Sequence, residues 1–209
     1  MPNDISALAD RQDLYALSLE GQRLLFTEAR TALKFSDEPV DDEQLRAIWE
    51  LFKWAPTGSN LSPMRILYVR TDDAKKRLVP LLTPPNRPKS ESAPVVAVVA
   101  VDSEFGEYGA HLCPSVPGLQ EVLAANPALR DASGNFNAAL QAGYFVLAVR
   151  AAGLAAGPMK GFNAEAVDAE FFPDGRWKSI LLVNIGRPAE DAWGERMPRL
   201  AYEQAVQLV

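Results

Sequence analysis

Three separated segments of the chain combine residue types that could hold a flat ligand carrying a phosphate. The first places Arg30, Thr31 and Lys34 at the end of a helical stretch, so that a guanidinium, a hydroxyl and an ammonium group fall close together. Such a donor set suits a phosphate. Residues 54–63 form a loop rich in small residues, and residues 157–162 (GPMKGF) form a tight turn after a strand. Both would let backbone amides approach a flat polar ligand.

Two more cations, Arg196 and Arg199, lie near the C-terminus. Taken singly, each segment has a simpler interpretation: the arginines as solvated surface charges, the loop as the end of a helix, the turn as an ordinary connection. The order and spacing of the segments along the chain decide between these interpretations and a binding site.

Side chains for acid–base or metal chemistry are scarce. His111 and Cys113 lack the spacing of a zinc site, and we interpret His111 as a loop residue without a chemical role. The chain has no GxSxG elbow, no GxxxxGK[ST] loop and no GxGxxG motif. The sequence therefore predicts either a binding protein or an enzyme whose chemistry belongs to a cofactor, without a catalytic side chain or a metal.

In order and spacing, the segments resemble the FMN-dependent nitroreductase family. That family carries R-x-S-x-R-x-F, A-P-S/T-x-x-N-x-x-P-W, a PM-x-GF turn and a basic C-terminal stretch, where this chain has ARTALKF, APTGSNLSPM, GPMKGF and RMPR. The resemblance runs from about Ala29 to Leu200. It is greatest with the malonic semialdehyde reductase branch, through KWAPTGSNLSPMRI, FFPDG, LLVNIG and RMPRL. The chain departs from the pattern at Ala29 and Leu33, where the family usually has basic residues, and at Met64, which replaces a tryptophan.

The resemblance implies a site for FMN. Its phosphate would lie against the arginines and the threonine, the loop would line the flavin from the partner subunit, Asn86 would read the pyrimidine edge, and the turn would lie under the rings. A backbone amide of Lys160 or Gly161 would point at flavin N5. The implied cofactor-binding residues are Arg30, Thr31, Pro56, Thr57, Gly58, Asn60, Asn86, Pro158, Met159, Lys160, Gly161, Arg196 and Arg199.

The resemblance also implies a ping-pong reaction in which NADH or NADPH is a transient co-substrate. The acceptor in the semialdehyde branch is malonic semialdehyde, reduced to 3-hydroxypropionate, and Arg65, Arg87 and Lys89 are candidates to meet its carboxylate. Reduction of nitroaromatics or quinones is the broader alternative. Two further alternatives are not enzymes: a flavin-binding protein without turnover, and a dimeric small-molecule binder without flavin.

Composition and charge bear on whether the protein binds nucleic acid, is secreted or spans a membrane. The 209 residues include 21 Lys and Arg, 27 Asp and Glu and one Cys, with a formal net charge of −6. An acidic chain with scattered cations is not expected to bind nucleic acid. Asp4 and Asp10 stand where a signal peptide would be positive, and no apolar run approaches the roughly 20 residues of a membrane span. We expect one cytoplasmic domain over residues 1–209.

The hydrophobic pattern predicts an α+β fold, with a central mixed sheet flanked by helices in an intertwined homodimer. Residues 94–101 read as a strand that is apolar on both faces, which must be covered on both sides. Residues 137–152 read as a helix that is apolar nearly all round, ended by Gly153 at C′. Such a helix is either a core helix or part of a dimer interface, and residues 104–134 are the least regular stretch. Other expected elements are a helix beginning at 41–43, strands at 65–70 and 179–185, helices at 75–82 and 164–171, and loops at 83–88 and 156–162.

Overall fold

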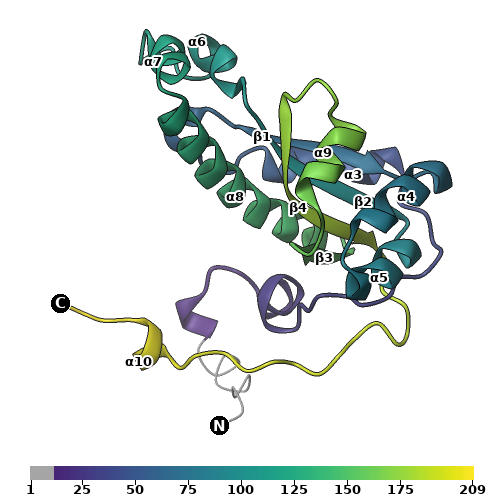
Figure 1. Cartoon of the computed structure of the whole chain (residues 1–209). Coiled ribbons are helices and arrows are strands. Elements are labelled where there is room, and N and C mark those ends of the chain that lie inside the picture. The colour runs from purple at the N-terminus through teal and green to yellow at the C-terminus, as the bar shows by residue number, and fades with distance from the viewer. Residues whose placement is uncertain (1–11) are drawn as a thin grey trace.

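The structure is a computed structural model that describes residues 12–209, and its fold is α+β, as predicted. A four-stranded sheet with strand order β1-β2-β4-β3 lies between two layers of helices (Figure 1). Its strands are β1 (Met64–Val69), β2 (Val95–Asp102), β3 (Ala155–Met159) and β4 (Trp177–Gly186). All three pairings are antiparallel, so the expectation of a mixed sheet was wrong for the strands described.

The central strand β2 divides the hydrophobic core in two. Every residue of β2 is buried, because Val95, Ala97, Val99 and Val101 face one helical layer while the residues between them face the other. The first layer contains α3 (Asp42–Phe52) and α8 (Pro127–Ala151), and the second contains α4 (Asp72–Leu78) and α9 (Ala164–Phe171). The two-sided apolar run of the sequence is thus explained by cover on both faces.

Local signals fix several helix ends where the sequence predicts them. Asp41 caps α3 and forms a capping box with Gln44, and Gly153 follows α8 with φ of +75°. Short helices fill the connections: α2 (Leu19–Gln22), α5 (Arg87–Ser92), α6 (Gly109–Leu112), α7 (Leu119–Ala125) and α10 (Tyr202–Ala205), with a π-helical turn at Arg23–Thr27 and 3₁₀ turns elsewhere.

The least regular stretch of the sequence, 104–134, is a helical excursion made of α6, α7 and the start of α8. Three local predictions need correction. The helix predicted from residue 137 begins ten residues earlier, at Pro127. Residues 155–159 are strand β3, although they were expected to form part of a loop. Gly157 and Pro158 disguise it, and proline is tolerated there because β3 is an edge strand. Residues 83–88 are a 3₁₀ turn and the start of α5.

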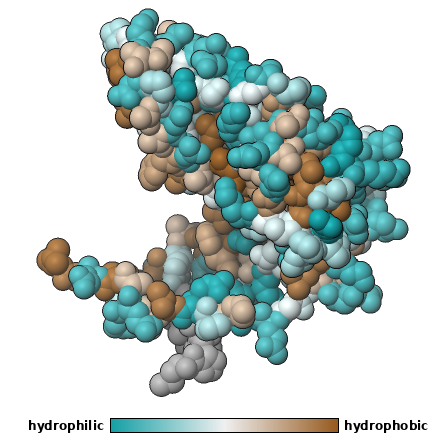
Figure 2. Space-filling view, viewed as in Figure 1, coloured by the Kyte–Doolittle hydropathy of each residue, from teal (hydrophilic) through white to brown (hydrophobic). Residues whose placement is uncertain are grey.

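The chain ends in an extended arm that stands away from the body (Figure 1). Apolar side chains are exposed along it, and Figure 2 shows brown patches on the arm and on the body facing the hollow between them. The exposed apolar residues of the arm are Met197, Leu200, Tyr202, Val206, Leu208 and Val209. No helix among residues 12–209 is long and apolar enough to cross a membrane. Asp4 and Asp10, the residues that speak against a signal peptide, lie outside the described residues.

Candidate functional site

Two segments far apart in the sequence run side by side and bring the predicted phosphate arginines together. The backbone N–H of Leu33 donates to Ala192 O at 2.9 Å, and that of Ser36 donates to Arg187 O at 2.9 Å. Beyond this pairing, the guanidinium groups of Arg30 and Arg196 each contact a backbone carbonyl of the opposite segment. The backbone pairing thus places the two arginine-bearing segments side by side.

The two arginines have no acidic partner among residues 12–209. Arg30 Nη1 donates to Gly194 O at 3.1 Å and its guanidinium lies 5.5 Å from the centre of the Trp193 ring. Arg196 Nη2 lies 3.5 Å from Phe26 O. Both side chains therefore carry positive charge satisfied only by neutral groups, which is the donor chemistry that a phosphate requires.

The other predicted phosphate ligands differ from this pair. Lys34 is ion-paired with Asp191 at 2.8 Å, and this partner holds the pKa of Asp191 below its usual value. Arg199 donates to the carbonyls of its neighbours Met197 and Pro198 and does not contact Arg30. Thr31 is exposed and follows Arg30 in the chain. Arg30 and Arg196 thus lie on paired segments, with Thr31 next to Arg30, and Arg199 does not join them.

Strand β3 lies directly against the arginine segment. A Cβ placed on Gly157 would lie 3.4 Å from Ala32 O and 3.3 Å from Asn184 Cβ, so only glycine lets the two backbones approach this closely. Behind the strand, Ser90 Oγ donates to Asn184 Oδ1 at 3.1 Å, and both side chains are fully buried. This buried hydrogen bond fixes the end of β3 from which residues 158–161 project.

Asn86 holds the turn that follows β3. Its Nδ2 donates to Gly161 O at 3.0 Å and lies 3.3 Å from Thr83 Oγ1, and Thr83 N also donates to Gly161 O at 3.0 Å. A Cβ on Gly161 would lie 2.5 Å from that Nδ2. Asn86 thus uses its amide donors on the turn and on Thr83, whereas the resemblance implied that it reads the pyrimidine edge of the flavin. Its Oδ1 accepts from Lys89 Nζ at 3.5 Å.

Lys160 follows β3 and meets a β-bulge. Between Val99 and Ala100 of β2 the register with β4 shifts, so Ile180 is the extra residue, and Lys160 Nζ donates to its carbonyl at 2.8 Å. No carboxylate is paired with this ammonium group in the described part of the chain. Beside it opens a cavity of about 370 Å³, whose other lining residues are Asn135, Ala139, Ala142, Gly143, Val146, Ile180 and Leu181.

The loop with Pro56, Thr57, Gly58 and Asn60 lies elsewhere in the protomer. Its hydrogen bonds go to α8 and to the helical excursion: Gly58 N donates to Asn137 Oδ1 at 2.7 Å, and Asn60 Nδ2 donates to Leu112 O at 2.9 Å. Among residues 12–209, no hydrogen bond or ion pair joins the loop to the Arg30 segment or to the turn at Gly161. Within one chain, the structure does not unite these two halves of the predicted site.

The cations that the sequence suggested for a substrate carboxylate are already engaged. Arg65 is paired with the buried Asp102 at 2.9 Å. Arg87 donates to the carbonyls of Leu82 and Pro80. Of the three, only Lys89 lies near the turn, because its Nζ donates to Oδ1 of Asn86, the residue that holds the turn. The resemblance implied that Lys160 lies under the flavin, but it did not predict that this cation lines a cavity. Its position depends on a β-bulge that no local sequence pattern predicts.

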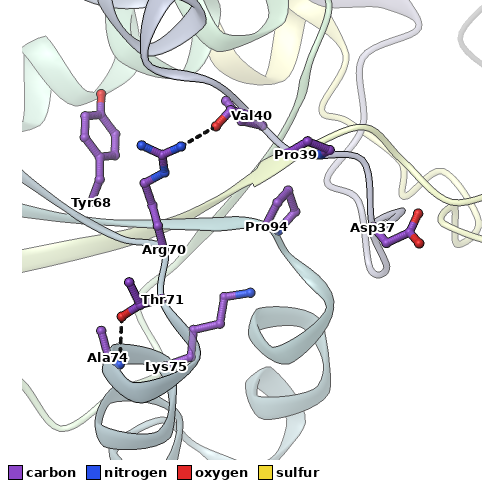
Figure 3. Close-up of a pocket in the computed structure, with 9 residues that line it drawn as sticks. All are labelled: Asp37, Pro39, Val40, Tyr68, Arg70, Thr71, Ala74, Lys75 and Pro94. Carbon is purple, nitrogen blue, oxygen red and sulfur yellow. Dashed lines mark hydrogen bonds between the residues drawn. The ribbon is translucent and has the colours of Figure 1, made fainter.

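A larger cavity of about 610 Å³ lies at the outer edge of β1 (Figure 3). Arg70, at its wall, donates to Val40 O at 2.8 Å and is paired with Asp42. Burial raises the pKa of Tyr68 to about 12, so its phenol stays neutral. This cavity shares no lining residue with the predicted site, and no sequence pattern indicated it.

Comparison with known proteins decides the family. Residues 27–187 match the Nitroreductase family. The chain belongs to this family. It is 57% identical over 187 residues to a Streptomyces coelicolor protein, covering 90% of this chain and 93% of that protein, and 50% identical over 188 residues to a second one, covering 90% and 95%. Both relatives carry the provisional name NADH dehydrogenase/NAD(P)H nitroreductase.

Solved nitroreductase structures share the fold. A Bacillus subtilis structure described as a nitroreductase superposes with a TM-score of 0.78 at 23% identity, over 91% of this chain and 99% of that chain. An Exiguobacterium sibiricum structure, described as a nitroreductase in complex with FMN, has a TM-score of 0.79 at 18% identity, over 92% and 98%. These likenesses place the described elements in the nitroreductase fold.

Proposed function

We propose that this nitroreductase family member is an FMN-dependent NAD(P)H oxidoreductase and that its acceptor is a small anionic aldehyde, malonic semialdehyde, which it reduces to 3-hydroxypropionate. The observation that carries the proposal is the pair Arg30 and Arg196, two cations without acidic partners beside the glycine-containing strand β3. The relatives named NAD(P)H nitroreductase and the FMN complex of a structural neighbour support the same cofactor and co-substrate.

The residues present fit FMN at both of its ends. Arg30, Thr31 and Arg196 would hold the phosphate, and the turn Pro158–Gly161 would support the rings, with the Asn86 Oδ1 acceptor facing the pyrimidine edge. FMN would supply hydride transfer, first from NAD(P)H and then to the acceptor. Overall, an aldehyde, NAD(P)H and one proton would give an alcohol and NAD(P)⁺. No described side chain is required to bond covalently to the substrate.

A second copy of the chain would complete the site. The outer side of α8 exposes Phe136, Leu140 and Tyr144, at 72%, 38% and 42%, while its inner side is buried in the core. Together with the apolar arm, this stripe suits an intertwined homodimer. A partner would then present its Pro56–Asn60 loop to the flavin, which explains why the loop and the turn do not meet within one protomer. The single domain and the cytoplasmic location remain predictions.

The cavity beside Lys160 favours an anionic acceptor. Its walls are mainly aliphatic and its only cation, Lys160, is satisfied by the neutral carbonyl of Ile180. A carboxylate entering this cavity would meet an ammonium group that has no competing acid. Nitroaromatics or quinones need only an apolar slot and reduced flavin, so this cation is the feature that separates the semialdehyde from the broader alternative.

The deciding experiment is the visible absorption spectrum of the purified protein, before and after addition of FMN and then of NADH or NADPH without oxygen. Oxidised-flavin bands that bleach with a nicotinamide, and reappear with malonic semialdehyde as 3-hydroxypropionate forms, are the expected result. Bound flavin that neither nicotinamide bleaches would mean a non-catalytic flavin binder. A protein that takes up no FMN would refute the cofactor itself.

Two acceptors of equal shape and different charge test the role of Lys160. With 4-nitrobenzoate and 4-nitrobenzamide, Lys160→Gln is expected to raise KM for the benzoate roughly tenfold, because a hydrogen bond to a charged group contributes about 1.5 kcal/mol or more, and to leave the benzamide unchanged. Lys178→Gln, a change of an exposed lysine on β4, is the matched control. Equal effects on both acceptors would exclude charge recognition by Lys160.

A further inference from the structure

The loop from Thr57 to Ser62 has an unusually constrained backbone. Ser59, Asn60 and Ser62 have φ of +52°, +54° and +45°, in the left-handed region that residues other than glycine seldom adopt. Such conformations persist only where surrounding contacts enforce them, and they cluster at functional sites. Several elements enforce this loop. Asn60 Nδ2 donates to Leu112 O at 2.9 Å, Arg65 Nη1 donates to Ser62 O at 2.9 Å, and two side chains of α8 hold the two ends.

Asn137 holds the beginning of the loop. This α8 residue is 5% exposed and its Oδ1 accepts from Gly58 N at 2.7 Å. Its Nδ2 donates to Ser133 O at 2.9 Å and lies 3.3 Å from Ser133 Oγ, which fixes the amide with its oxygen toward the loop. A Cβ on Gly58 would lie 3.5 Å from Nδ2, so loop and helix are in van der Waals contact.

Gln141 holds the other end of the loop, one helical turn further along α8. It is 3% exposed, and its Oε1 accepts from Met64 N at 3.0 Å, where the loop enters β1. Between these two anchors, Thr57 Oγ1 accepts from Ser62 N at 3.1 Å and closes the loop on itself. Two buried amides on one helix face thus clamp both ends of a strained segment.

We propose that Asn137 and Gln141 are positioning residues that set the conformation of the Thr57–Ser62 loop so that it can contact flavin across the dimer interface. This rests on the proposed function. Neither side chain would touch the cofactor, because both are buried beneath the loop. Their helix carries Phe136, Leu140 and Tyr144 on its outer side, so a single rigid element presents the partner surface and holds the loop that the partner's flavin would meet.

The test removes each acceptor at nearly constant side-chain volume. Asn137→Leu removes the acceptor for Gly58 N, and Gln141→Met removes the acceptor for Met64 N. Hydrogen exchange of residues 57–62 and the FMN dissociation constant are measured on the full-length protein. We expect both variants to speed exchange in the loop at least tenfold and to weaken FMN about tenfold.

Asn126→Ala is the control for general destabilisation of α8. Asn126 caps the same helix by accepting from Leu129 N at 3.1 Å, away from the loop. It is expected to lower Tm without changing exchange in residues 57–62. Equal loop exchange in the Asn126→Ala and Asn137→Leu variants, or loop exchange in Asn137→Leu and Gln141→Met as slow as in wild type, would overturn the clamp. Faster loop exchange with unchanged FMN affinity would overturn the link between the clamp and the flavin. A wild-type protein that binds no FMN would instead refute the proposed function. Hydrogen exchange would still test the clamp in that case.

Discussion

The side-chain amide of Asn86 donates to the carbonyl oxygen of Gly161 at 3.0 Å, and a Cβ on Gly161 would lie 2.5 Å from that same nitrogen. The two residues are thus matched: the amide fits against the turn only because residue 161 has no side chain. One hydrogen bond and one missing methyl group together set the path of the turn that would support the flavin rings.

Replacing Asn86 by Ala is expected to weaken the binding of both FMN and riboflavin about fivefold, since one lost hydrogen bond contributes about 1 kcal/mol. Gly161→Ala should weaken both flavins further, because the new methyl group displaces the amide. In the double variant the clash with Asn86 Nδ2 is gone, but Thr83 Oγ1, which would lie 2.6 Å from the new Cβ, remains. The two effects should therefore be less than additive without cancelling. Flavin titration monitored by fluorescence measures all three, with Gln44→Ala in the α3 capping box as control.

Arg30 is expected to act on the phosphate alone. Arg30→Gln removes a cation that has no acidic partner, so FMN should bind roughly tenfold more weakly, as expected for loss of a charge-assisted hydrogen bond at a partly solvated site. Riboflavin, which lacks the phosphate, should bind as before. Arg187→Gln, whose arginine is paired with Glu38, is the matched control. Equal losses for FMN and riboflavin would place Arg30 away from the phosphate.

A basic residue restored at position 33, where the family usually has one, should strengthen FMN binding. Leu33 is 43% exposed, and its Cδ1 would lie 3.5 Å from a Cβ on Gly194, the residue whose carbonyl holds Arg30. Leu33→Arg should therefore tighten FMN severalfold and leave riboflavin unchanged. An unchanged FMN affinity would show that the departure at Leu33 is compensated elsewhere.

Much of the framework could be predicted because its signals are local. The capping box at Asp41 fixed the start of α3, and the apolar run of β2 could only be a strand covered on both sides. The end of strand β3 was taken for a turn because Gly157 and Pro158 oppose strand formation and are tolerated only at an edge. The helices within residues 104–134 could not be placed individually, because α6 and α7 are short and lack side-chain caps.

The site divides in the same way. The family resemblance located Arg30 and the turn at Gly161, but their surroundings depend on long-range contacts. Arg65 was a wrong candidate for the substrate because folding places it on Asp102, a carboxylate at the far end of β2. Lys160 became the cavity cation only through the bulge at Ile180. No local sequence pattern predicts either the Arg65–Asp102 ion pair or the β-bulge at Ile180.

The dimer surface can be tested with a substitution that the isolated protomer tolerates. A Cβ on Gly143, an exposed residue of α8, meets nothing within 4 Å, and arginine suits a helix. Gly143→Arg should leave Tm of the protomer fold intact and abolish the dimer and FMN binding together. Val146→Glu should also abolish both, with a lower Tm because Val146 packs half-buried against the core. Light scattering with flavin titration measures both. Ala169→Arg on α9 is the control, and a flavin-loaded Gly143→Arg dimer would exclude α8 from the interface.

Asp102 gives the protein an acid-side dependence of stability. The carboxylate is 1% exposed; burial opposes its ionisation, but hydrogen bonds from Arg176 and the Glu104 N–H, with the charges of Arg65 and Arg176, outweigh burial and lower its pKa. A folded-state pKa below the unfolded value means that the unfolded chain takes up the proton first as pH falls. The stabilisation is therefore complete above the ordinary aspartate range and is lost as pH drops through the folded-state pKa.

Replacing Asp102 by Asn should lower the free energy of unfolding at pH 7 by roughly 2–3 kcal/mol, less than for a fully enclosed ion pair, because Arg65 and Arg176 are 22% and 34% exposed and stay partly hydrated. The loss should shrink as pH falls below about 4, since the wild-type carboxylate is then protonated as well. Urea unfolding from pH 7 to pH 3 measures the difference. Asp168→Asn, which affects the hydrogen bond from Ser179 N, is the control. A constant difference between wild type and Asp102→Asn across this range would mean that the lost stability comes from packing rather than from the charge on Asp102.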